Sequence, residues 1–210
     1  MTVVLGPLVV EAVDPAAVTA FWSAVLGSDA VRRHLLVRAQ TLPKRVKNRV
    51  HLDIYVRDPQ DLLALGAVVL AEYLPERVTM ADVEGNEFCA FIAPREAGAG
   101  PARVFAVCTD SAEPERIAAW WADLVGARVG NGPDGTPRWL HDAAGWEGLV
   151  WKFVRVPDER VVPNRWQWSV RDHTEAVAAG AISTGAADYV DPDGNEFTAL
   201  VGHPGGPISR

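Results

Sequence analysis

One acidic turn motif occurs twice in the chain. Segment 84–88 reads Glu-Gly-Asn-Glu-Phe, and segment 193–197 reads Asp-Gly-Asn-Glu-Phe. Gly-Asn favours a tight turn, and the residues after it have the composition of a strand that begins at Glu87 or Glu196. A carboxylate at the mouth of a strand is a candidate metal ligand or general base. The repeat therefore predicts a duplicated chain with an acidic residue at the same point of each half, and Glu87 is the candidate catalytic residue.

The segment Val50–Val56 predicts a strand with two different faces. Side chains alternate along a strand, so Leu52, Ile54 and Val56 share one face, which we expect to be buried. The opposite face carries polar and aromatic groups, and the strand after Glu87 continues the same alternation. In the first half we expect the ligand to be bound by His51, Asp53, Tyr55, Cys89 and Phe91; the matching candidates of the second half are Gln167 and Glu196.

Apolar spacing and cap signals predict the elements around these strands. Pro15 and Pro114 each occupy the first turn of a predicted helix. Trp22 and Trp121 stand at equivalent positions of these helices, where a tryptophan is expected to pack into the core. The second half is longer between its helix and its Asn-Arg pair, and a hairpin within residues 127–148 accounts for the added length.

The repeat also predicts the domain organisation. We expect an α+β protein with domain one over residues 1–94 and domain two over residues 103–202. Residues 95–102 are small and rich in Gly, Ala and Pro, which favours a linker, and residues 203–210 form a tail.

Composition excludes several classes of function. A net charge of −7 and a pI near 5.2 argue against nucleic acid as a partner, because nucleic-acid binding needs a basic surface. The first residues lack the basic segment of a signal peptide and are interrupted at Gly6 and Pro7, so neither secretion nor a membrane span is expected. The cytoplasm is the expected location. Cys89 and Cys108, one in each half, predict two separate thiols rather than a disulfide.

The order of these segments resembles the vicinal oxygen chelate superfamily, in particular glyoxalase-like domains of the glyoxalase, bleomycin-resistance and dioxygenase type. The matching segments are 14–27, 43–53, 65–67 and 84–88 in the first half, and 153–157, 164–165 and 191–197 in the second. The resemblance implies tandem glyoxalase-like domains built from paired βαβββ modules around cupped pockets, with the first module of domain one shortened.

The resemblance also implies where a metal would bind. In metal-dependent members, a His or Glu of the first strand, a His of the strand opening the second module and a Glu of the last strand hold one divalent ion. His51 takes the second role here and Glu87 the third, whereas the first strand has no histidine and leaves Glu11 or a partner chain as the source. Candidate ions are zinc, magnesium, manganese, nickel and iron. The simpler alternative is that His51 and Glu87 hydrogen-bond each other or Asp53.

Three hypotheses of function remain open. We favour a protein that binds a small organic molecule without a complete metal site, with no other cofactor implied. The alternative is a divalent-metal-dependent lyase, isomerase or dioxygenase that uses His51 and Glu87. In the third hypothesis domain two is purely structural. The expected partner is a small molecule, with neither nucleic acid nor membrane, and the resemblance allows a homodimer.

Overall fold

The computed structural model describes residues 2–93 and 102–200. The predicted linker at 95–102, apart from Ala102, and the predicted tail at 203–210 lie outside the described residues. None of the helices in the described ranges is long and apolar enough to cross a membrane.

The first half of the chain forms one short and one complete module. The short module contains β1 (Leu8–Ala12), α1 (Pro15–Leu26), α2 (Ser28–His34) and β2 (Leu35–Ala39). The complete module contains β3 (Val50–Val56), α3 (Gln60–Ala64), β4 (Val68–Tyr73), β5 (Arg77–Ala81) and β6 (Glu87–Ile92). The shortened first module is therefore confirmed, while α2 is a helix that the sequence pattern did not predict.

The second half forms two complete modules. The first contains β7 (Ala102–Ser111), α4 (Pro114–Val125), β8 (Arg128–Asn131), β9 (Pro137–His141) and β10 (Val150–Arg155). The second contains β11 (Trp166–Val170), α5 (Thr174–Ala178), β12 (Ile182–Ser183), β13 (Asp188–Val190) and β14 (Glu196–Ala199). The hairpin predicted within residues 127–148 is the β8–β9 pair.

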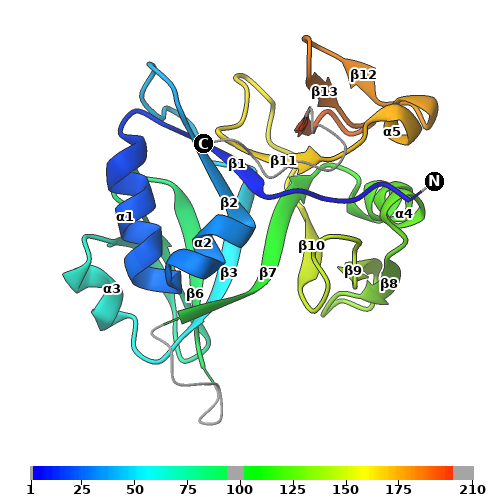
Figure 1. The fold of residues 1–210 in the computed structure, drawn as a ribbon. Helices are drawn as coiled ribbons and strands as arrows, with labels where there is room; N and C mark the ends of the chain where they lie inside the picture. The colour runs from blue at the N-terminus through cyan, green and yellow to red at the C-terminus, as the bar shows by residue number, and fades with distance from the viewer. Residues whose placement is uncertain (1, 94–101, 201–210) are drawn as a thin grey trace.

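Each of the two sheets draws strands from both halves of the chain (Figure 1). The eight-stranded sheet has the order β4-β5-β6-β3-β7-β10-β9-β8, and the six-stranded sheet has the order β12-β13-β14-β11-β1-β2. The halves join where β3 pairs antiparallel with β7 and where β1 pairs antiparallel with β11. Each sheet therefore joins a module of one half to a module of the other half. The division of the chain into two domains stays a prediction made from the sequence repeat.

Helices α1 and α4 connect the two sheets through tryptophans. The Trp22 ring lies 5.2 Å from Phe88 of the eight-stranded sheet and 5.6 Å from Trp166 of the six-stranded sheet. Trp121 of α4 repeats this bridge, at 5.0 Å from Trp151 and 5.4 Å from Phe197. These rings are 0–3% exposed, so the expectation that the helical tryptophans are core residues is confirmed.

The same tryptophans bind the acidic turn of each half through an aspartate. Asp82 accepts hydrogen bonds from the backbone N–H groups of Glu84 and Asn86, each at 2.9 Å, and from Trp22 Nε1 at 3.1 Å. In the second copy, Asp191 accepts a bond of 3.0 Å from Trp121 Nε1 and closes its own turn in the same way. The motif is therefore first of all a structural one, because it fixes a turn against a helix in each half.

Candidate functional site

The face of the eight-stranded sheet that points away from α1 and α4 carries a polar cluster. Phe88 and Trp151 pack toward the helices, so their neighbours in sequence lie on the opposite face. Cross-strand pairing places His51 beside Cys108, Asp53 beside Cys89, and Cys108 beside Lys152. We call this surface the Asp53 face, and its residues are His51, Asp53, Tyr55, Cys89, Phe91, Phe105, Cys108 and Lys152.

Asp53 is the centre of this face. Its side chain is 3% exposed, and Oδ2 accepts a hydrogen bond of 2.8 Å from Lys152 Nζ and one of 3.3 Å from Cys108 Sγ. The other oxygen, Oδ1, lies 3.6 Å from His51 Nε2, which is beyond hydrogen-bond distance. Cys89 Sγ lies 3.7 Å from the same imidazole nitrogen. A carboxylate, an ammonium, an imidazole and two thiols therefore meet around one buried point.

Two polar atoms of the cluster have no hydrogen-bond partner among the described residues. They are His51 Nδ1 and Asp53 Oδ1, and both are buried. Buried polar atoms in folded proteins are normally hydrogen-bonded, and an unpaired one costs roughly 1–3 kcal/mol. These two atoms are consequently where a bound molecule can gain the most from polar contacts.

Burial also sets the protonation states at this face. Loss of hydration lowers the pKa of His51 below its usual range, against the smaller opposing effect of Asp53, so the imidazole is neutral at pH 7. Burial raises the pKa of Cys89 and raises that of Cys108 well above the ordinary thiol range. Both cysteines are free and protonated, in agreement with the expected absence of a disulfide.

Aromatic rings extend the face beyond the polar cluster. Tyr55 stacks on Phe105 with ring centroids 4.0 Å apart, and Phe91 meets Phe105 edge to face at 5.1 Å. The Lys152 ammonium lies 4.6 Å from the Phe105 centroid, 5.3 Å from Phe91 and 5.1 Å from Trp139. The cation is thus held by one carboxylate and several ring faces, and the adjoining surface is apolar.

Glu87 makes its hydrogen bonds outside the polar cluster, although its charge acts on His51. Its carboxylate is bound by Lys44 Nζ at 2.6 Å and by the Asn48 backbone N–H at 3.0 Å, and the two side chains of the ion pair are 14–15% exposed. Glu11, the remaining candidate for a third metal ligand, belongs to β1 in the other sheet, where Gln40 approaches it at 3.4 Å. The roles assigned to Glu87 in catalysis and in metal binding stay predictions.

Three residues of the Asp53 face carry ligand atoms that lie close enough together to hold a metal ion. Ligand atoms of His51, Asp53 and Cys108 all lie within 4.8 Å of one another. A divalent ion does not fit among them with Lys152 in place, because the ammonium contacts the same carboxylate and like charges repel. A cysteine binds metal as a thiolate, so an ion here would also have to displace the proton that burial keeps on Cys108.

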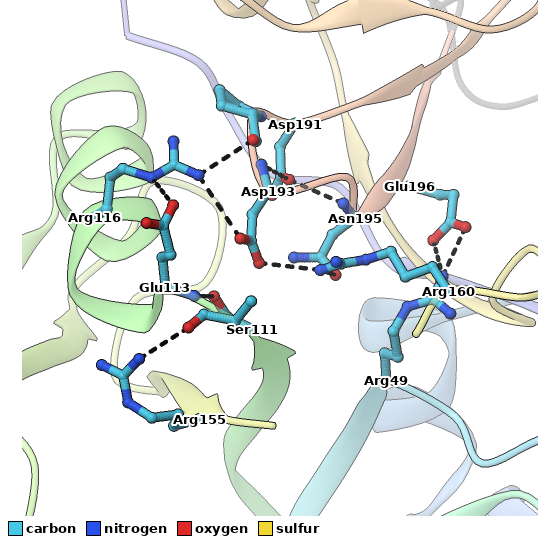
Figure 2. A network of polar contacts seen from close by, with 12 residues as sticks. Arg49, Ser111, Glu113, Arg116, Arg155, Arg160, Asp191, Asp193, Asn195 and Glu196 are labelled. Carbon is cyan, nitrogen blue, oxygen red and sulfur yellow. Dashed lines mark hydrogen bonds and ion pairs between the residues drawn. The ribbon is translucent and has the colours of Figure 1, made fainter. Parts of the chain in front are cut away.

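The candidates of the second half lie on the six-stranded sheet. Gln167 donates from Nε2 to the Asn164 carbonyl at 2.8 Å and accepts from the Thr198 hydroxyl at 3.3 Å. Both oxygens of Glu196 accept from Arg49 Nη2, at 2.7 and 2.6 Å (Figure 2). Each of the two is bound by other protein groups, and the structure does not bring them to the Asp53 face.

A polar network surrounds the second acidic turn. Figure 2 shows Arg116 and Arg160 converging on Asp193 from different elements, while Arg49 reaches Glu196 from the first half. The Arg160 contact with Asp193 is 3.0 Å, and the Asp193 side chain is 4% exposed. The acidic residue that opens this turn is therefore neutralised by arginines and serves the stability of the fold.

A separate cavity of about 410 Å³ lies between the segments 40–48 and 162–165. Its polar lining includes Glu11, Asn48 and Asn164, and its apolar lining residues are Leu42, Pro43, Val46, Val162 and Pro163. Lys44 and Arg165 also border it, but Lys44 is paired with Glu87 and Arg165 with Glu84 at 2.9 Å. The cavity adjoins the boundary between the halves and contains no residue of the Asp53 face.

Sequence reasoning missed two residues of the cluster. Lys152 and Cys108 were not among the candidate ligand-binding residues, although both lie on strands with clear alternation. In β10, Trp151 and Phe153 are buried on one side, so Lys152 had to lie on the other. That signal was available, but nothing in the local pattern showed that β7 pairs with β3 and β10 with β7.

Comparison with known proteins agrees with this architecture. A family model described as a glyoxalase-like domain matches residues 7–91 and 106–200. Glyoxalase I from Zea mays is 13% identical over 94% of this chain and 92% of that chain, with a TM-score of 0.61. A protein described as a putative dioxygenase from Bacillus subtilis subsp. subtilis str. 168 is 12% identical over 93% of this chain and 84% of that chain, with a TM-score of 0.63. At these identities the two likenesses show a shared fold. A search of curated proteins finds no match.

Proposed function

The chain belongs to the glyoxalase-like domain family, and on that premise we propose that it binds one small organic molecule on the Asp53 face. The observation that carries the proposal is the pair of buried, unpaired atoms His51 Nδ1 and Asp53 Oδ1. A ligand that donates a hydrogen bond to the carboxylate oxygen, or that pairs with the imidazole nitrogen, removes the cost of leaving that atom unsatisfied.

The surroundings of these atoms suit a molecule with an apolar body. Small-molecule sites are usually lined by aromatic and aliphatic groups with a few convergent polar atoms. Tyr55, Phe91 and Phe105 supply ring faces and edges, and each is partly rather than fully buried. The polar atoms then determine orientation, while the rings supply most of the contact area.

The chain offers a matched pair of variants for testing this proposal. His51 and Gln167 occupy equivalent positions of β3 and β11, but only His51 lies on the Asp53 face. Saturation-transfer NMR with benzoate, phenol and benzamide on the wild-type protein should detect binding of at least one probe. His51→Ala should weaken that binding by at least tenfold, since it removes one of the two polar anchors, while Gln167→Ala should leave it unchanged.

Two results would contradict the proposal. One is the absence of saturation transfer from the wild-type protein to all three probes at millimolar concentration. The other is an equal loss of binding in Gln167→Ala and His51→Ala, which would place the molecule elsewhere or assign it to a general loss of folding. Circular dichroism of both variants separates these two causes.

A metal-dependent enzyme of the lyase, isomerase or dioxygenase type is the second candidate function, favoured by the donor group of His51, Asp53 and Cys108. Metal analysis of protein purified without chelator distinguishes the two. The binding proposal expects less than one tenth of an equivalent of zinc, magnesium, manganese, nickel or iron after supplementation. One equivalent of metal that is lost in Asp53→Asn or in Glu87→Gln would contradict the metal-free binding proposal and favour the enzyme.

A further inference from the structure

Lys152 places a positive charge beside two of the three donor residues of the Asp53 face, Asp53 and Cys108. Its Nζ lies 2.8 Å from Asp53 Oδ2, and its side chain is only 12% exposed. Cross-strand pairing sets Lys152 beside Cys108, which in turn pairs with His51. The ammonium therefore lies against Asp53 and beside Cys108, two of the three residues that form the donor group.

The hydrogen-bonding capacity of this ammonium exceeds what the protein uses. A lysine ammonium has three donors, and among the described residues only Asp53 accepts one of them. The other close neighbours are the ring faces of Phe91, Phe105 and Trp139, which attract the charge but do not replace a hydrogen-bond acceptor. An anionic oxygen is the group that matches a desolvated ammonium with donors to spare.

We infer that the Lys152 ammonium is the resident cation of this site, taking the place of a divalent ion beside Asp53, and that it binds the carboxylate of a small aromatic or aliphatic acid. The choice of a carboxylate rests on the proposed function, whereas the replacement of a metal by Lys152 does not. Asp53 holds the ammonium from one side, and the ligand carboxylate approaches its remaining donors.

The first experiment asks whether removing the lysine uncovers a metal site. Cobalt chloride is titrated into the apo protein at pH 7.5 under reducing conditions, and thiolate-to-cobalt absorption in the near ultraviolet is recorded. Wild type should show no stoichiometric signal. Lys152→Ala, and Lys152→Gln in case the first variant does not fold, should bind cobalt at least tenfold more tightly, because Asp53 and Cys108 then lose the competing charge.

Lys44→Ala is the matched control for this titration. It also removes a part-buried lysine that is paired with a carboxylate, but the Lys44–Glu87 pair lies outside the donor group. Lys44→Ala should therefore gain no cobalt binding, and adding Cys108→Ala to Lys152→Ala should abolish the gain. Stoichiometric cobalt in the wild type, or no gain in either folded Lys152 variant, would overturn the assignment of Lys152 as the resident cation.

The second experiment tests the chemical class of the ligand. Benzoate and benzamide have nearly the same shape but differ in charge, so their dissociation constants report on the ammonium directly. Wild type should prefer benzoate by at least tenfold, and Lys152→Gln should abolish that preference while retaining the ring contacts. A preference for benzamide in the wild type, or an unchanged preference in Lys152→Gln, would refute the carboxylate assignment. If phenol binds wild type but neither of these probes does, the carboxylate assignment alone fails. If none of the three binds, the proposed function fails with it, and the cobalt titration still decides the role of Lys152.

Discussion

The eight-stranded and the six-stranded sheet are built to the same plan, yet the groups at their centres differ in kind. In the eight-stranded sheet His51 pairs across the strands with Cys108, and in the six-stranded sheet Gln167 pairs with Val9. The difference continues one strand further, where Lys152 stands beside Cys108 and Leu36 beside Val9. Ionisable and thiol groups thus gather in one sheet, and amide and aliphatic groups take their places in the other.

The two glutamates of the repeated turn show what the sheets have in common. Glu87 accepts the backbone N–H of Asn48 and pairs with Lys44, while Glu196 accepts the backbone N–H of Asn164 and pairs with Arg49. Each glutamate is bound by the start of a neighbouring strand and by a cation. The repeated motif therefore maintains the fold in both sheets, whereas the residues of the neighbouring strands decide where chemistry can occur.

The largest expected difference between the sheets concerns Asp53 and the equivalent Ser169. Asp53→Ala leaves the buried Lys152 ammonium without its carboxylate and should cost about 3–5 kcal/mol of unfolding free energy. Ser169→Ala removes a single hydrogen bond to the Pro7 carbonyl and should cost about 1 kcal/mol. Urea denaturation at pH 7 measures both. Adding Lys152→Met to Asp53→Ala should recover most of the loss, and equal costs for the two single variants would contradict the contrast.

A smaller effect than the loss in Asp53→Ala is expected at the second acidic turn, where the free energy of unfolding should depend on pH. Burial raises the pKa of Asp191 to about 6 from its ordinary value of 3.8, despite the hydrogen bond from Trp121. Between pH 4 and 6 the folded state then keeps a proton that the unfolded chain has released, so this contribution is complete below pH 4 and is lost as pH rises through 6. The loss is up to about 3 kcal/mol, since one pKa unit corresponds to about 1.4 kcal/mol.

The carbon-13 shift of the Asp191 carboxyl group measures this pKa directly. A titration midpoint near pH 6 is expected, together with a matching decline in the free energy of unfolding over the same interval. A midpoint at or below pH 4 would show that the hydrogen bonds from Trp121, Asp193 and Asn195 outweigh burial.

The smallest of the three effects tests whether the six-stranded sheet is purely structural. Glu196→Ala removes both hydrogen bonds to Arg49 and should lower the free energy of unfolding by about 2 kcal/mol, because the buried guanidinium loses its carboxylate and keeps its bond to the Val162 carbonyl. Affinity for benzoate should not change. A tenfold loss of benzoate binding in the folded variant would instead give the second acidic turn a part in ligand binding.

Much of the fold follows from local patterns in the sequence. The alternation of Val50–Val56 correctly separates buried Leu52, Ile54 and Val56 from the Asp53 face, because a strand exposes successive side chains to opposite sides. Pro15 opens α1 as expected, with Asp14 accepting the Ala17 N–H at 3.0 Å. Helix α2 was missed because its seven residues contain one buried side chain, Val31, and so lack an apolar period.

The candidate site was only partly predictable for a different reason. Strand alternation identified His51, Asp53, Tyr55, Cys89 and Phe91 as sharing a face, since β3 and β6 belong to one module. It did not bring in Cys108 or Lys152, whose strands lie in the other half of the chain. The pairing of β3 with β7 depends on how complete modules fit together, which no local spacing records.

The sequence by itself determined that the chain is a duplication, that each half contains an acidic turn, and that His51 and Asp53 lie on the polar face of a strand. These are properties of period and turn chemistry, which act over a few residues. Only the tertiary structure decided that Glu87 is paired with Lys44 and that Lys152 meets Asp53 at 2.8 Å. Ion pairs between distant segments depend on which strands become neighbours, and that choice comes from burying the shared core rather than from the motifs themselves.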